Sequence, residues 1–140
     1  MTTANDYRFW CEEKLRNVDT DRQGHVNNTL IAAFFEAGRI EVLHHPDNTA
    51  PWTTCGIVLA RQLINYKKEL YFPGKVQVGT RVSRIGRSSL DFEQVLIAEN
   101  GEVASGEATC VLIDLASRKP VEVPSSMRQH LTGSTAGTKP

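Results

Sequence analysis

Residues 19–43 read DTDRQGHVNNTLIAAFFEAGRIEVL, and in this stretch a polar loop passes directly into a helical pattern. From Leu30 onward the apolar side chains recur at helical spacing. Asn27 and Asn28 are good residues for capping a helix N-terminus, and Pro46 prevents the helix from continuing. We therefore expect one helix of about four turns.

Gly38 stands in the interior of this predicted helix. Glycine at such a position costs about 1 kcal/mol relative to alanine, because it loses more backbone freedom on folding. A close approach of the helix to a sheet would explain its presence, and simple tolerance is the alternative.

Strand patterns flank the helix on both sides. Between Tyr7 and Leu15, apolar side chains alternate with charged ones, as in a strand with one buried face. Four more strand patterns follow the helix: GIVLA (56–60), VQVGTRV (76–82), LDFEQVLIA (90–98) and VASGEATCVLID (103–114). Turn signals fall at residues 72–74, 86–89 and 100–101, the last an Asn-Gly pair typical of a hairpin. The order predicts a strand, a helix and then four strands in a meander.

These elements predict an α+β fold in a single domain, residues 1–131. The remaining residues, 132–140, contain a single apolar side chain among polar and small ones, and we expect a disordered tail there. One helix covers only one face of a five-stranded sheet, so part of the apolar surface needs another cover. A second subunit is the simplest one, and we expect a homodimer or a homotetramer.

Composition excludes several classes of function. Sixteen basic and sixteen acidic residues cancel, which argues against binding of nucleic acid or an anionic membrane. The three cysteines are widely spaced and form no C-x-x-C pair, which argues against a disulfide framework and a cysteine-rich metal site. The first residues contain no apolar signal core, and no apolar run reaches the roughly 20 residues of a membrane span. We expect a cytoplasmic protein with no metal and no cofactor.

The loop before the helix carries groups that suit acyl transfer. The first N–H groups of a helix are unpaired and lie at the positive end of its dipole, where a carbonyl oxygen gaining charge is stabilised. Asp21 precedes Asn28 by seven residues, and a turn at Gly24 would let it fold back over the helix start. A carboxylate beside such a donor can act as a general base or as a nucleophile. The alternative is that these Asp, Asn and Gly residues only cap the helix and form the turn.

DTDRQGHVNN, FFEAGRIEVL, YKKEL and RIGRSSLDFE together resemble the 4-hydroxybenzoyl-CoA thioesterase-like family of the hotdog fold. The resemblance spans roughly residues 7–115. It implies a five-stranded antiparallel sheet wrapped around one long central helix, with two subunits that join their sheets side by side. It also implies hydrolysis of acyl-CoA thioesters.

Carried over by position, the resemblance makes Asp21 the catalytic carboxylate and the N–H of Asn28 the donor to the thioester carbonyl. It gives Asp19 a mainly structural role in the loop. His25 and Asn27 become candidates for substrate binding; a catalytic His25 is the alternative to loop packing or pocket lining. The sequence departs from the family at Ile31, where many members have tyrosine, which affects the shape of the acyl pocket.

The resemblance also places a phosphate contact for coenzyme A near the turn at residues 86–89, at the subunit boundary. The candidates are Arg84, Arg87, Ser88 and Ser89, of which Arg87 with the two serines matches best. An arginine fork and hydroxyl donors suit phosphate oxygens. Ordinary solvated strand residues are the alternative.

The sequence therefore predicts an acyl-CoA thioesterase with a backbone oxyanion donor and an aspartate base or nucleophile. Two other functions stay open: a non-catalytic acyl-CoA binding protein and an acyl-carrier-protein thioesterase on the same fold. The acyl group is not specified by the sequence.

Overall fold

The computed structural model describes residues 6–46, 48 and 51–132. Among them lie five strands, two α-helices and one short 3-10 helix. In chain order these are β1 (Phe9–Lys14), η2 (Asn17–Asp19), α1 (Asn28–Leu43), β2 (Cys55–Tyr66), β3 (Lys75–Ile85), β4 (Ser89–Ala98), β5 (Gly101–Asp114) and α2 (Ser125–Thr132). Neither α-helix has the length and apolar character needed to cross a membrane.

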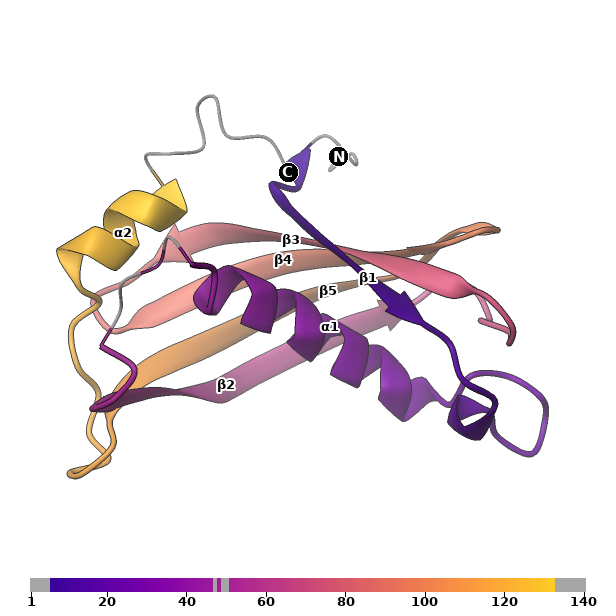
Figure 1. The fold of residues 1–140 in the computed structure, drawn as a ribbon, viewed down its shortest axis with the longest axis horizontal. Coiled ribbons are helices and arrows are strands. Elements are labelled where there is room, and N and C mark those ends of the chain that lie inside the picture. Colours follow the sequence, from indigo (N-terminus) through magenta and orange to yellow (C-terminus); the bar gives the residue numbers. More distant parts are fainter. Residues whose placement is uncertain (1–5, 47, 49–50, 133–140) are drawn as a thin grey trace.

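The five strands form one antiparallel sheet in the order β1-β3-β4-β5-β2. The sheet curves around α1, which lies along one of its faces (Figure 1). This arrangement confirms the predicted α+β hotdog fold with a long central helix. The N-terminal end of α1 and the end of the sheet near α2 lie at opposite ends of the molecule (Figure 1).

The α1 helix forms and packs as its sequence pattern predicts. Its apolar positions are spaced three or four residues apart and bury one face against the sheet: Ile31, Phe34, Phe35, Gly38, Val42 and Leu43. The predicted start is confirmed, because Asn27 is the N-cap residue and its side-chain oxygen accepts a hydrogen bond from the N–H of Thr29. This start places the first turn of α1 beside the loop that precedes it.

The predicted close approach at Gly38 is also confirmed. A methyl group on Gly38 would lie 2.6 Å from Thr80 Oγ1, 2.7 Å from Val78 Cγ1 and 2.8 Å from Gln94 Nε2. Gln94 is buried there and donates to the main-chain oxygen of Phe35, which ties the helix to β4. Glycine is needed because the helix backbone rests directly on these side chains.

The prediction of a four-strand meander was wrong for β2. Strands β3, β4 and β5 do follow one another, but β2 pairs with β5 along Cys55–Tyr66 and not with β3. The edge of β3 that a meander would give to β2 is occupied by β1. Strand pairing of this kind depends on contacts far apart in the chain, which local patterns do not encode.

Two smaller predictions also change. The hairpin between β4 and β5 is present, but its two loop residues are Glu99 and Asn100, since Ala98 pairs with Gly101. The helix α2 was not predicted; its buried Met127 and Leu131 pack in a cluster with α1 and the sheet. The expected tail, 132–140, overlaps the end of α2 at residue 132, and its remainder lies outside the described residues.

Candidate active site

The loop between η2 and α1 is organised around Asp21. Its carboxylate oxygen Oδ1 accepts hydrogen bonds from the N–H groups of Gln23 at 2.9 Å and His25 at 3.2 Å. Its own N–H donates to the carbonyl of His25 at 2.7 Å, and Gly24 supplies the turn with a φ of +86°. Within the described residues no hydrogen bond to Oδ2 is found. One oxygen therefore holds the turn, and the other is available to a ligand.

Asp19 has the structural role that the sequence predicted. Its side chain is buried, with 3% exposed, and accepts from the N–H and the guanidinium of Arg16 at 3.0 and 2.8 Å. The hydrogen bond from the Arg16 side chain holds the pKa of this carboxyl below its ordinary value. The carbonyl of Asp19 accepts from the N–H of Asn27, which fixes both ends of the loop.

The start of α1 provides a hydrogen-bond donor next to this loop. Asn27 uses its side chain as the cap, accepting from both the N–H and the hydroxyl of Thr29. Asn28 is the first helical residue, so its N–H has no partner within the helix. Asn28 and Asp21 are both exposed in the single chain.

A cavity of about 350 Å³, here called the site cavity, lies between the loop and the connection that follows β2. The two segments are joined by a hydrogen bond from the N–H of Val26 to the carbonyl of Leu70 at 2.7 Å. The residues that line the site cavity are Asp21, Gln23, His25, Val26, Asn28, Ile31, Tyr66, Lys67, Lys68, Glu69 and Leu70. The structure thus brings together three predicted site residues, Asp21, His25 and Asn28, and leaves Asn27 outside the lining.

His25 is the most enclosed ionisable group of the site cavity, with 23% of its side chain exposed. Its Nε2 lies 3.2 Å from Glu69 Oε2, and its ring stands edge-on to that of Tyr71. Tyr71 donates its hydroxyl to the same carboxylate, and this hydrogen bond raises the pKa of Tyr71 above its ordinary value. The imidazole is held from two sides.

The site cavity offers a carboxylate and a helix N-terminal N–H, but no thiol nucleophile. None of the three cysteines lines it, and burial raises the pKa of Cys11 to about 11 and also raises that of Cys110. Across residues 6–46, 48 and 51–132, no group of three or more His, Cys, Asp or Glu side chains is placed to hold a metal ion. The groups present suit attack on a carbonyl carbon whose oxygen is held by the helix start.

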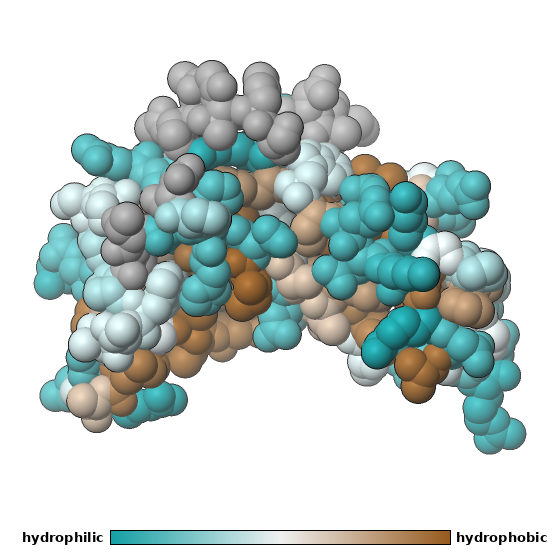
Figure 2. Space-filling model, viewed as in Figure 1, coloured by the Kyte–Doolittle hydropathy of each residue, from teal (hydrophilic) through white to brown (hydrophobic). Residues whose placement is uncertain are grey.

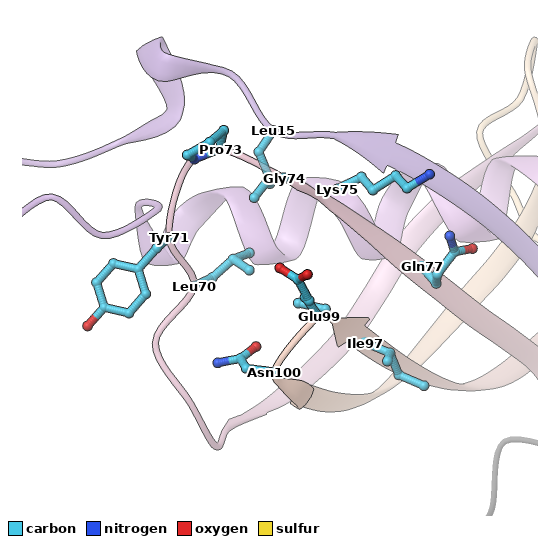
Figure 3. A pocket seen from close by; sticks show the side chains of 11 residues that line it. Leu15, Leu70, Tyr71, Pro73, Gly74, Lys75, Gln77, Ile97, Glu99 and Asn100 are labelled. Carbon is cyan, nitrogen blue, oxygen red and sulfur yellow. The ribbon is translucent and has the colours of Figure 1, made fainter.

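A larger cavity, of about 680 Å³, lies next to the site cavity and shares Leu70 with it. It opens between the connection before β3 and the β4–β5 hairpin, with Tyr71 and Pro73 on one side and Glu99 and Asn100 on the other (Figure 3). Asp21 and Asn28 do not line it. The smaller cavity is therefore the candidate active site, since size alone does not supply the reacting groups.

The predicted phosphate site lies elsewhere in the molecule. Arg87 belongs to the turn between β3 and β4, where the N–H of Gly86 donates to the carbonyl of Ser89. This turn is at the α2 end of the sheet, because the carbonyl of Arg87 accepts from the N–H of Val123 just before α2 (Figure 1). Within one chain the turn is a strand length away from Asp21, about 35 Å for the 11 residues of β3.

The other three candidates share this location, and two of them have main-chain roles. Ser88 accepts at its carbonyl from the N–H of Leu112, and Ser89 begins β4. Arg84 is exposed, and its guanidinium lies 4.0 Å from Asp91. A single chain does not bring any of them to the site cavity.

Sequence reasoning missed Tyr66 and Glu69 as site residues. Both come from YKKEL, one of the stretches that carried the family resemblance. The available signal was a run of polar residues directly after an apolar strand. Lys67 and Lys68 stand between them, and they contact Glu102 and the carbonyl of Asn100, respectively.

Comparison with protein families gives one match, to a model described as the thioesterase-like superfamily, over residues 15–131. A search of curated proteins finds no match. Many solved structures are similar, among them a Pseudomonas aeruginosa protein with 27% identity, coverage of 97% of this chain and 94% of that one, and a TM-score of 0.83.

Two further solved structures bear on chemistry by their descriptions. A predicted thioesterase from Bacillus stearothermophilus is 27% identical, with 89% and 94% of the two chains covered and a TM-score of 0.79. A thioesterase from Thermus thermophilus, solved in complex with coenzyme A and zinc, is 26% identical, with 90% and 98% covered and a TM-score of 0.78.

Proposed function

The chain belongs to the thioesterase-like superfamily and is a thioester hydrolase, and we propose that its substrates are acyl-CoA thioesters, which it hydrolyses in the site cavity to a free acid and coenzyme A. The observation that carries the proposal is that one cavity holds both the Asp21 carboxylate, bound to the main chain through Oδ1 alone among the described contacts, and the N–H of Asn28, which has no partner within its helix. The similar thioesterase that was solved with coenzyme A supports the choice of ester.

In the proposed reaction the thioester carbonyl oxygen accepts a hydrogen bond from the N–H of Asn28. The helix dipole stabilises the negative charge that this oxygen gains when the carbonyl carbon is attacked. The C–S bond then breaks, and coenzyme A leaves as a thiolate that takes up a proton.

Asp21 has two routes in this reaction. As a general base it takes a proton from water, whose oxygen adds to the carbonyl carbon. As a nucleophile its oxygen forms an acyl anhydride, which water hydrolyses in a second step. Both routes use the oxygen Oδ2, because Oδ1 is engaged by the main chain.

Asp21→Asn tests the proposal. Asparagine keeps an oxygen for the N–H groups of Gln23 and His25, so the turn is retained, but it is neither a base nor a competent nucleophile. We expect kcat for acyl-CoA hydrolysis to fall by about 100-fold or more with KM little changed. Initial rates on a panel of short, long, branched and aromatic acyl-CoAs measure this, with the equivalent carrier-protein esters alongside.

The matched control for this substitution is Asp19→Asn, which makes the same change two residues earlier at a buried side chain outside the site cavity. It should keep kcat near the wild-type value. A folded Asp21→Asn protein with wild-type kcat would refute the proposed mechanism. Faster turnover of carrier-protein esters than of acyl-CoAs would show that the substrates are carrier-protein thioesters. The proposed reaction would stay the same.

A second subunit would complete this site. Asp21 and Asn28 are exposed in the single chain, whereas a hydrolase benefits from a site that excludes bulk water. Hydrophobic side chains gather along the concave lower edge of the molecule, over α1 and β2 (Figure 2). We propose that two chains pair here, which would cover the site cavity.

The phosphate contact at Arg87 is compatible with this site only in such an assembly, because Arg87 is remote from Asp21 of its own chain. We propose that the turn of one subunit binds the nucleotide phosphates of a substrate held by the other. Arg87→Ala should then raise KM for acyl-CoA and leave kcat nearly unchanged, since a phosphate contact is the same in ground and transition states. The expected loss is on the order of 1 to 3 kcal/mol, and it should shrink with added salt.

An acyl-pantetheine, which lacks the nucleotide phosphates, provides the control substrate for Arg87→Ala. Wild type and variant should hydrolyse it equally. If both substrates slow alike, Arg87 has a structural role in the turn before α2 instead.

A further inference from the structure

His25 and Glu69, which line the site cavity, form a connected unit with Tyr71, which lines the larger cavity beside it. The proposed reaction does not use this unit. Glu69 Oε2 lies 3.2 Å from Nε2 of His25, and Glu69 Oε1 accepts a 2.6 Å hydrogen bond from the hydroxyl of Tyr71. The rings of His25 and Tyr71 meet edge-on, with 5.1 Å between their centroids. Each oxygen of the Glu69 carboxylate thus has its own partner.

His25 connects this unit to Asp21 through the main chain. Its N–H donates to Asp21 Oδ1, and its carbonyl accepts from the N–H of Asp21 at 2.7 Å. A shift of His25 would therefore move the groups that orient the Asp21 carboxylate. The unit reaches across two segments, because His25 precedes α1 whereas Glu69 and Tyr71 follow β2.

We propose that Glu69 is a positioning residue, which holds His25 in place and thereby fixes the direction of the free carboxylate oxygen of Asp21. The inference rests on the proposed function, because it requires Asp21 to act on the substrate. The main chain already joins the two segments through Val26 and Leu70 and through a bridge between His25 and Tyr71. Glu69 adds a side-chain contact that holds the imidazole itself.

Loss of the Glu69 side chain should lower the reaction rate without lowering the stability of the fold. Its side chain is 60% exposed, and contacts between exposed charged groups contribute little to stability. Catalysis is more demanding, because a displacement of about 1 Å in a reacting group can cost a large factor in rate. A positioning role therefore predicts a lower kcat in a protein that unfolds at the wild-type temperature.

Two substitutions at Glu69 remove its contacts with His25 and Tyr71 to different extents. Glu69→Ala removes both contacts, whereas Glu69→Gln leaves one oxygen for two partners. We expect kcat to fall about tenfold in Glu69→Ala and by a smaller factor in Glu69→Gln, with KM within about twofold of wild type. The matched control is Glu12→Gln, a half-exposed carboxylate on β1 that contacts Lys75 and lies outside the site cavity; it should keep wild-type kcat.

The double variant His25→Ala/Glu69→Ala tests the route of the effect. If Glu69 acts through His25, the double variant is no slower than His25→Ala alone, whereas independent effects multiply. Multiplied effects, a wild-type kcat in Glu69→Ala, or a change confined to KM would each overturn the inference.

Asp21→Asn, measured with the same acyl-CoA, separates the inference from the proposed function. A slow Asp21→Asn beside an unaffected Glu69→Ala overturns the inference alone. A wild-type rate in Asp21→Asn overturns the proposed function, and the inference with it.

Discussion

The two aspartates of the loop show how burial separates roles between identical side chains. Asp19 is buried and bound by Arg16, while Asp21 is exposed, and the described part of the chain gives its Oδ2 no hydrogen bond. The first arrangement stabilises the loop, and the second leaves capacity for a ligand. The family resemblance and the local surroundings therefore both give Asp19 a structural role and leave Asp21 as the candidate reacting group.

Asp19→Asn should lower stability and leave turnover intact. The charge-assisted hydrogen bonds to Arg16 are lost, but the Arg16 side chain is 68% exposed, so solvent already weakens the pair. We expect a loss of about 1 kcal/mol, which is about 3 °C in Tm for a domain of this size. Thermal unfolding followed by circular dichroism at pH 7 measures it.

The same pair of proteins gives a pH test. The pKa of Asp19 is lowered in the folded state, so its stabilisation is complete above the unfolded value of about 4 and is lost as pH falls through the lower folded value. The Tm difference between wild type and Asp19→Asn should accordingly shrink in acid. A difference that stays constant into acid would show that the Asp19 charge contributes nothing.

At the level of single residues, the sequence could predict the roles of residues whose hydrogen-bond partners are close in the chain. Asp21, Gly24 and Asn27 act within a few residues of their own positions, so turn and capping chemistry could identify them. Glu69 reaches His25 from 44 residues away, and no local pattern encodes that contact.

At position 38 of the central helix, the contact with the sheet and not helix propensity determines which residue is tolerated. On propensity alone Gly38→Ala would stabilise by about 1 kcal/mol. The added methyl group would lie within 2.8 Å of three side chains, on Thr80, Val78 and Gln94, so we expect destabilisation of about 1 to 3 kcal/mol instead. Urea unfolding of wild type and Gly38→Ala measures whether the free energy of unfolding falls or rises.

Ala33→Gly is the matched control for that substitution, because Ala33 is exposed on the same helix. It should cost only the propensity difference of about 1 kcal/mol. A stabilised Gly38→Ala protein would contradict the close packing of α1 on the sheet.

At the level of elements, periodicity predicted the five strands and α1 but neither α2 nor the place of β2. Of the α2 side chains at residues 125–131, two are buried, Met127 and Leu131, and two apolar positions among polar neighbours are too short a pattern to stand out. The place of β2 depends on a connection of eight residues, 67–74, that leads away from β5 to the far side of the sheet.

The whole molecule has a long, exposed edge at β2. This strand has 12 residues, and four of its large hydrophobic side chains are at least 37% exposed: Val58, Leu59, Leu63 and Tyr66. Long apolar edges invite pairing with another chain. We expect a dimer as the smallest stable species, or a tetramer built from dimers, in analytical ultracentrifugation at micromolar concentration.

Leu59→Lys tests whether β2 forms the subunit contact. A buried, unpaired charge at the interface should shift the sedimentation profile toward the monomer. Val18→Lys makes the same kind of change at a side chain that is 77% exposed outside the sheet, and it should leave the assembly intact. A folded and active wild-type monomer would contradict the proposed pairing.

The strand order also constrains how the polypeptide reaches this structure. Strand β1 pairs with β3, which is synthesised about 65 residues later, and β2 pairs with β5, the last strand. The first two strands are therefore made well before the strands with which they pair. Contacts of such high sequence separation slow folding, because the loops must close before the contacts form. On the ribosome the apolar face of α1 would therefore emerge well before the sheet that covers it. Nascent chains truncated before β5 should need a chaperone, while the complete chain folds unaided.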